Sequence, residues 1–161
     1  MMWWIIGTLV CIGLILFWMK ARYNTSCAQL REIHLVLKDP LTDEGLRILH
    51  LSDLHVERLS LSPERLIDEI GRQKIDIIAL TGDFLDRVKS QDKFLRYLDA
   101  IVQLQPRYGV YAVFGNHDYV IEPYLPNLKK EMERRGCRVL INECETFHVN
   151  GKNLNIIGID D

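Results

Sequence analysis

Three short and mostly apolar segments set narrow limits on the fold of this 161-residue chain. They cover residues 46–52, 75–82 and 108–115. Segments this short and this apolar are typical of strands that are buried on both faces. Between them, residues 62–73 and 90–106 place apolar side chains at helical spacing. This order of strands and helices predicts an α/β fold whose sheet is mostly parallel and is covered by helices.

The remaining segments predict further elements around that sheet. Residues 31–38 alternate in polarity and suit a strand, and residues 126–136 suit a helix that ends at Gly136. Three more strands are predicted at residues 138–142, 145–150 and 154–160. The sequence Asn-Gly-Lys-Asn between the last two favours a tight hairpin.

The first 19 residues contain no charged side chain. As a helix they would span about 28 Å, close to the roughly 30 Å hydrocarbon core of a bilayer. Tryptophans near both ends favour the same interpretation, because these side chains prefer membrane interfaces. We therefore predict a transmembrane anchor at residues 1–22, followed by a linker at residues 23–30.

Two alternatives to an anchor fit the first 19 residues less well. A cleaved signal peptide would have a charged start and a small-residue cleavage site, and a buried core helix would rarely carry three tryptophans. Lys20 and Arg22 follow the apolar segment, and no basic residue precedes it. The positive-inside rule then predicts a single-pass membrane protein whose larger part is cytoplasmic.

The charge of the chain argues against a nucleic-acid partner. The formal net charge is −2, with 20 Lys and Arg against 22 Asp and Glu. These charges are mixed along the chain, so no segment forms the basic surface that nucleic acids require.

Polar side chains follow each of the three apolar strands, at the point where the strand ends. The carboxyl ends of parallel strands meet at one edge of a sheet, where α/β proteins bind their ligands. Carboxylate, amide and imidazole groups together suit divalent ions such as Mn, Fe, Zn or Ni. The residues in question are Asp53, His55, Asp83, Asp86, Asn116, His117 and Asp118.

The spacing of these residues has a physical reason. Asp53 and His55 are two positions apart, so in extended backbone their side chains point to the same side. Asp83 follows Gly82, which lets the backbone approach a ligand closely. Each residue alone has an ordinary explanation: a cap for Asp53 or Asp86, a loop position for His55, a turn for Asp83. Their occurrence at three successive strand ends favours a metal site.

The sequences LSDLH, TGDFLD and FGNHD resemble the first three motifs of the calcineurin-like metallophosphoesterases. The chain is most similar to the membrane-associated bacterial branch, including its final GIDD. The resemblance implies a four-layer α/β/β/α sandwich, with residues 31–161 as its N-terminal portion. It also implies two divalent metal ions and the hydrolysis of a phosphate mono- or diester, possibly lipid-linked.

The resemblance implies a set of metal ligands. Asp53 and His55 would bind the first ion, Asp83 would bridge the two ions, and Asn116 would bind the second through its side-chain oxygen. A carboxylate between two cations reduces their mutual repulsion.

Catalytic roles follow from the same resemblance. His117 would donate a proton to the leaving group or stabilise charge on the phosphoryl oxygens. Asp118 would orient His117 and raise its basicity. Asp86 would support the site from outside the ligand set.

The family pattern also contains a later histidine and a Gly-His-x-His pair, which this sequence lacks. We therefore expect the chain to be the N-terminal part of a longer enzyme, and to bind metal weakly and turn over slowly alone. The alternative is a non-catalytic, membrane-tethered module that keeps the fold without a complete metal site.

Overall fold

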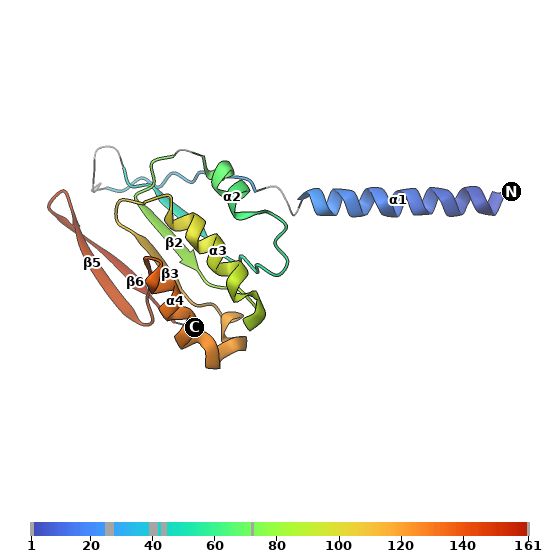
Figure 1. The fold of residues 1–161 in the computed structure, drawn as a ribbon. Helices are drawn as coiled ribbons and strands as arrows, with labels where there is room; N and C mark the ends of the chain where they lie inside the picture. Colours follow the sequence, from blue (N-terminus) through green and yellow to red (C-terminus); the bar gives the residue numbers. More distant parts are fainter. Residues whose placement is uncertain (1, 25–27, 39–41, 43–44, 72, 161) are drawn as a thin grey trace.

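The computed structural model describes residues 2–24, 28–38, 42, 45–71 and 73–160. Its first element is helix α1 (Met2–Asn24), which projects away from the α/β body (Figure 1). Side chains 3–23 are all exposed, and residues Trp3–Tyr23 are long and apolar enough to cross a membrane. The helix runs two residues past the predicted anchor, and positions 25–27 of the predicted linker lie outside the described residues.

A parallel sheet forms the centre of the body. Its strands are β1 (Ile48–Leu51), β2 (Ile77–Thr81), β3 (Val110–Val113) and β4 (Cys137–Val139), in that spatial order. All three neighbouring pairs are parallel. The predicted α/β class and the parallel pairing of the three apolar strands are confirmed.

Helices cover one face of this sheet (Figure 1). They are α2 (Pro63–Ile70), α3 (Gln91–Val102) and α4 (Leu125–Arg134), with short 3-10 helices η1 (Val88–Ser90) and η2 (Asp118–Tyr124) before α3 and α4. The Ser62 side chain accepts a hydrogen bond from the Arg65 backbone N–H at 3.3 Å, which caps the first turn of α2. The largest fully buried side chains of the core between these helices and the sheet are Tyr97, Phe84, Phe94, Ile78 and Leu80.

An antiparallel hairpin covers the opposite face of the sheet. It consists of β5 (Glu143–Val149) and β6 (Lys152–Gly158). Phe147 stacks on Tyr108 of the loop before β3, with ring centroids 4.9 Å apart. At the predicted tight turn, Asn150 and Gly151 have φ angles of 50° and 78°, as a type I′ turn requires. The described residues thus form three layers of the predicted four-layer sandwich: helices, parallel sheet and hairpin.

The predicted strand at residues 31–38 is wrong, because no strand occurs among described residues 28–38. A strand needs a neighbour to satisfy its backbone groups, and none of the described strands pairs with this segment. Its apolar side chains are correspondingly exposed: Ile33 by 73%, Leu35 by 82% and Val36 by 97%. Alternating polarity here does not translate into a paired strand.

Candidate metal centre

The loops after β1 and β2 continue side by side beyond the sheet. The backbone N–H of His55 donates to the Asp83 carbonyl at 2.9 Å, and that of Val56 donates to the Phe84 carbonyl at 3.1 Å. These bonds extend the register of the two strands into the polar loops. The two loops therefore present His55 and Asp83 next to each other.

Two glycines allow the loops after β2 and β3 to approach closely. Gly82 has a φ of +76°, and a Cβ atom added there would lie 2.4 Å from the Gly115 backbone nitrogen. A Cβ atom on Gly115 would lie 2.4 Å from Oδ1 of Asp83. Any larger side chain at either position would clash with backbone or with Asp83. This explains why the second and third motifs both contain glycine before their polar residues.

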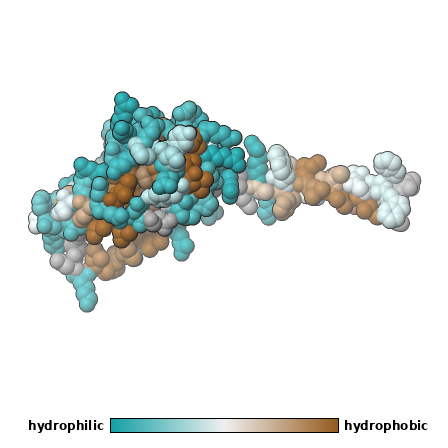
Figure 2. Space-filling model, turned by 90° about the horizontal axis from the view of Figure 1, so that it is seen from below, coloured by the Kyte–Doolittle hydropathy of each residue, from teal (hydrophilic) through white to brown (hydrophobic). Residues whose placement is uncertain are grey.

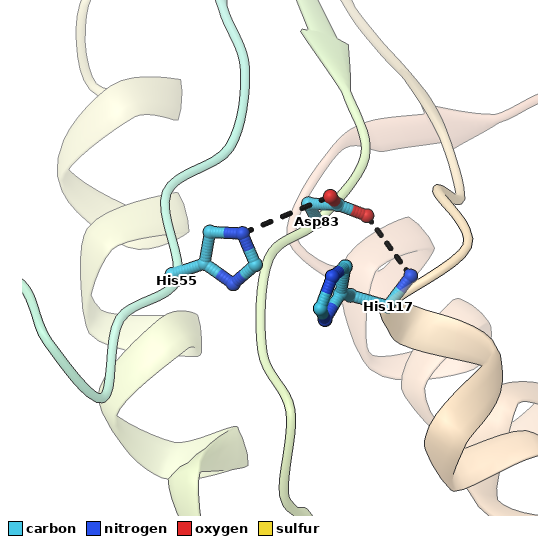
Figure 3. Close-up of side chains that lie close together, drawn as sticks. All are labelled: His55, Asp83 and His117. Atoms are coloured by element: carbon cyan, nitrogen blue, oxygen red, sulfur yellow. Dashed lines mark hydrogen bonds and ion pairs between the residues drawn. The ribbon is translucent and has the colours of Figure 1, made fainter.

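The three loops bring His55, Asp83 and His117 together (Figure 3). One potential ligand atom from each residue lies within 4.8 Å of the other two. Nε2 of His55 is 3.7 Å from Oδ2 of Asp83, and the two imidazole rings are nearly perpendicular with centroids 4.9 Å apart. Oδ1 of Asp83 accepts a hydrogen bond from the His117 backbone N–H at 3.0 Å, which ties the carboxylate to the third loop.

The cluster fits a divalent cation. Two imidazoles and one carboxylate form a donor set that binds Mn, Fe, Zn or Ni. Nδ1 of His55 is buried and has no hydrogen-bond partner among the described residues, although Oδ1 of Asp86 lies 3.3 Å away. Nε2 of the same ring lies beside Asp83 and is the atom that the ring can offer to an ion, whereas Nδ1 lies beside Asp86.

The backbone of the site lies in an unusual conformation. Asp53, His55 and Asp83 have φ angles of 55°, 35° and 56°. These values fall in the left-handed region, which costs a residue other than glycine on the order of 1 kcal/mol. Strain of this kind is typical of functional sites, where the surrounding structure holds side chains in a required position.

Asp86 contacts the ring of His117 directly. Oδ1 of Asp86 lies 3.0 Å from Nδ1 of His117. Burial works to raise the pKa of the Asp86 carboxyl, but the hydrogen bond with His117 and the nearby His55 ring outweigh it and hold this pKa below its usual range. Asp86 thus stays ionised beside the two imidazoles.

The predicted contact between Asp118 and His117 is wrong. Asp118 is fully buried, and its carboxylate accepts four backbone hydrogen bonds instead. Burial raises the pKa of this carboxyl above its usual range, against the opposing effect of the four donors. Asp118 joins the loops after β2 and β3. The carboxylate that contacts the His117 ring is that of Asp86. The four donors are the N–H groups of Asp83, Phe84, Leu85 and Gly115.

Two of the predicted ligands, Asp53 and Asn116, are exposed, and Asp53 is not a member of the three-residue cluster. The Asp53 carboxylate accepts a hydrogen bond from the Ser52 hydroxyl. Both residues follow the strands whose loops carry the cluster. Their assignment as ligands remains a prediction.

Sequence reasoning missed Glu57. Its Oε1 atom accepts hydrogen bonds from the backbone N–H groups of Asp86 at 2.9 Å and Arg87 at 3.1 Å. The signal in the sequence was a further carboxylate two residues after His55.

Comparison with known proteins supports the same interpretation. A family model described as calcineurin-like phosphoesterase matches residues 46–158. YkoQ of Bacillus subtilis, named a metallophosphoesterase, is 46% identical over 159 residues, which make up 98% of this chain and 59% of that protein. No solved structure matches the chain significantly.

Two shorter matches connect the chain to proteins whose names refer to lipids or membranes. LpxG of Chlamydia muridarum, named a UDP-2,3-diacylglucosamine pyrophosphatase, is 36% identical over 47% of this chain and 23% of its own length. A Danio rerio protein, named a transmembrane protein with metallophosphoesterase domain, is 36% identical over 52% of this chain and 19% of its own length. The chain thus spans about three fifths of YkoQ and less of the other two. The phosphoesterase motifs, the parallel sheet and these matches together show that the chain belongs to the calcineurin-like phosphoesterase family.

Proposed function

We propose that the protein hydrolyses a phosphate mono- or diester at a centre of two divalent metal ions on the carboxyl edge of the sheet. The observation that carries this proposal is the convergence of His55, Asp83 and His117 from three separate loops. Asp53 and His55 would hold one ion, Asn116 the other, and Asp83 both. When bound, such ions activate water and neutralise charge on phosphoryl oxygens.

His117 is the residue we assign to proton transfer. Its side chain is 45% exposed, so a substrate bound at the centre can reach it. Because Asp86 contacts Nδ1, the other ring nitrogen, Nε2, is the atom that would give a proton to the leaving oxygen. The contact with the Asp86 carboxylate would hold the His117 ring in the orientation that this transfer requires. Asp118 would act only by holding the loops together.

We further propose that the substrate is lipid-linked. Helix α1 would anchor the protein in a membrane, and its exposed apolar surface supports this (Figure 2). LpxG is named for a diacylated nucleotide sugar, which is a lipid-linked pyrophosphate. A site close to the membrane would meet such head groups at high local concentration. The cytoplasmic orientation remains a prediction from Lys20 and Arg22.

The activity is proposed for the whole protein, because the chain spans 59% of YkoQ. That these 161 residues alone bind metal weakly and turn over slowly stays a prediction. Further ligands from other parts of a longer chain would explain such behaviour, since described side chains supply three clustered ligand atoms.

The test measures release of p-nitrophenol by the protein in detergent micelles with added Mn²⁺. Substrates are p-nitrophenyl phosphate and its bis ester. UDP-diacylglucosamine and the acyl-free nucleotide sugar are compared by chromatographic analysis of the UMP that hydrolysis of the pyrophosphate releases. We expect metal-dependent hydrolysis that His117→Ala reduces by at least 100-fold, and faster turnover of the acylated substrate. Hydrolysis that chelation leaves unchanged would contradict the metal centre. Equal rates on both nucleotide sugars would contradict the lipid-linked substrate.

A further inference from the structure

We infer that Glu57 is a positioning residue that places the Asp86 carboxylate against the two histidines. This inference rests on the proposed function, because it assigns Glu57 a part in the same site. Within the described part of the chain, the Glu57 carboxylate forms no hydrogen bond with either histidine. It acts through the loop that carries Asp86.

The Glu57 side chain links the loops after β1 and β2 at the point where their backbone pairing ends. The N–H groups of His55 and Val56 donate to the carbonyls of Asp83 and Phe84. The next link between these loops is the Glu57 side chain, whose Oε1 accepts from the N–H groups of Asp86 and Arg87. The side chain therefore fixes the backbone of Asp86 at the level of the site.

The position of Asp86 matters because one of its oxygens serves both imidazoles. Oδ1 lies 3.0 Å from Nδ1 of His117 and 3.3 Å from Nδ1 of His55. The contact with His117 is a hydrogen bond, and a shift of Asp86 away from the site by about 1 Å would break it. The orientation of the two rings in the candidate centre thus depends on where Glu57 holds the Asp86 backbone.

The segment that carries Glu57 is itself fixed from its outer side. Lys93 of α3 donates hydrogen bonds to the carbonyls of Val56 and Leu59, the latter at 3.0 Å. The Tyr97 hydroxyl, also on α3, donates to the Leu61 carbonyl. These contacts hold residues 56–61 against α3, so Glu57 reaches the Asp86 loop from a rigid support.

Only one carboxylate oxygen of Glu57, Oε1, accepts the hydrogen bonds from the Asp86 loop. Oε2 is buried and has no hydrogen-bond partner among the described residues. The proposed role therefore requires one acceptor atom at the correct reach, and it does not require the negative charge. Glutamine keeps the reach and loses the charge, whereas aspartate keeps the charge and is one methylene too short.

The experiment compares Glu57→Gln, Glu57→Asp and Glu57→Ala in the full chain in micelles, with Glu69→Ala, an exposed carboxylate on α2, as control. Three quantities are measured: amide hydrogen exchange at Asp86 and Arg87, Mn²⁺ affinity by calorimetry, and the kcat and KM of hydrolysis. We expect Glu57→Asp and Glu57→Ala to speed exchange at both amides at least fivefold. Mn²⁺ affinity and kcat should fall about tenfold, with KM little changed.

Glu57→Gln and Glu69→Ala should resemble the unaltered protein in all three measurements. If Glu57→Gln behaves as Glu57→Ala, or if Glu57→Asp resembles the unaltered protein, the inference is overturned. A global loss of structure would speed amide exchange in all strands of the sheet. A local effect of Glu57→Asp would speed exchange at Asp86 and Arg87 and leave the strands unchanged. Failure of the unaltered protein to hydrolyse any ester would refute the proposed function, while the exchange rates would still test the role of Glu57.

Discussion

Asp118→Asn tests whether Asp118 acts as a structural tie and not as the partner of His117. In the structure, Oδ1 accepts from the N–H groups of Phe84 at 2.9 Å and Leu85 at 3.2 Å. Oδ2 accepts from those of Asp83 at 2.8 Å and Gly115 at 3.0 Å. Asparagine keeps one oxygen and replaces the other with an NH₂ group, which faces two donors.

The magnitude follows from these four bonds. Two backbone N–H groups lose their acceptor, and each unsatisfied buried group costs about 1–3 kcal/mol. Removing a buried charge whose pKa is raised offsets part of this loss. We therefore expect the free energy of unfolding to fall by about 2–4 kcal/mol. With a urea m-value of about 2 kcal/mol/M, the unfolding midpoint should fall by about 1–2 M.

Urea unfolding in micelles, followed by circular dichroism at 222 nm, measures this change. Tryptophan fluorescence is unsuitable, because Trp3, Trp4 and Trp18 all lie in α1. Asp68→Asn, an exposed position on α2, is the control and should change stability by less than about 0.5 kcal/mol. Asp86→Asn should also leave the midpoint nearly unchanged while it reduces hydrolysis. An Asp118→Asn midpoint equal to that of Asp68→Asn would refute the reasoning.

Two further predictions concern the approach of the loops and the buried thiol. Gly115→Ala would place a methyl group against the Asp83 carboxylate and should lower the Mn²⁺ affinity, measured by calorimetry, at least tenfold. Gly13→Ala is the control, because Gly13 has open space around it, and it should leave this affinity unchanged. Equal affinities in the two variants would contradict the close approach of Gly115 to Asp83. Buried Cys137 should resist an alkylating reagent that modifies exposed Cys144, as measured by peptide mass spectrometry. Comparable labelling of the two cysteines would contradict the burial of Cys137. Burial raises the pKa of the Cys137 thiol to about 12, so the folded state retains its proton where the unfolded state loses it. The urea midpoint should therefore fall as the pH rises above about 9, and less so in Cys137→Ala; an identical decline in both proteins would contradict this.

The sheet was predictable because its signals are local. Continuous apolar strands, the Ser62 cap of α2 and the Asn150–Gly151 turn each follow from nearby residues, and the structure agrees with all three. The segment at residues 31–38 shows the opposite case. Its alternating polarity describes a strand, but pairing depends on a distant partner that local sequence does not specify.

The candidate site was predictable as a group of residues and less so in its internal contacts. Parallel pairing alone placed His55, Asp83 and His117 at one edge of the sheet. The choice between Asp86 and Asp118 as the partner of His117 was decided by the path of the backbone. Asp118 begins η2 and is buried, where four backbone N–H groups donate to its carboxylate. Asp86 is partly exposed and contacts the His117 ring.

X-ray absorption at the zinc edge of the Zn²⁺-loaded chain would decide whether His55 binds a metal ion at this edge of the sheet. The position of His55 beside Asp83 predicts multiple scattering from an imidazole ring in the unaltered chain. His55→Ala should weaken or remove that signal, and His117→Ala should leave it, because His117 is assigned to proton transfer. A spectrum without imidazole scattering, or one that His55→Ala leaves unchanged, would contradict a metal centre at this edge of the sheet.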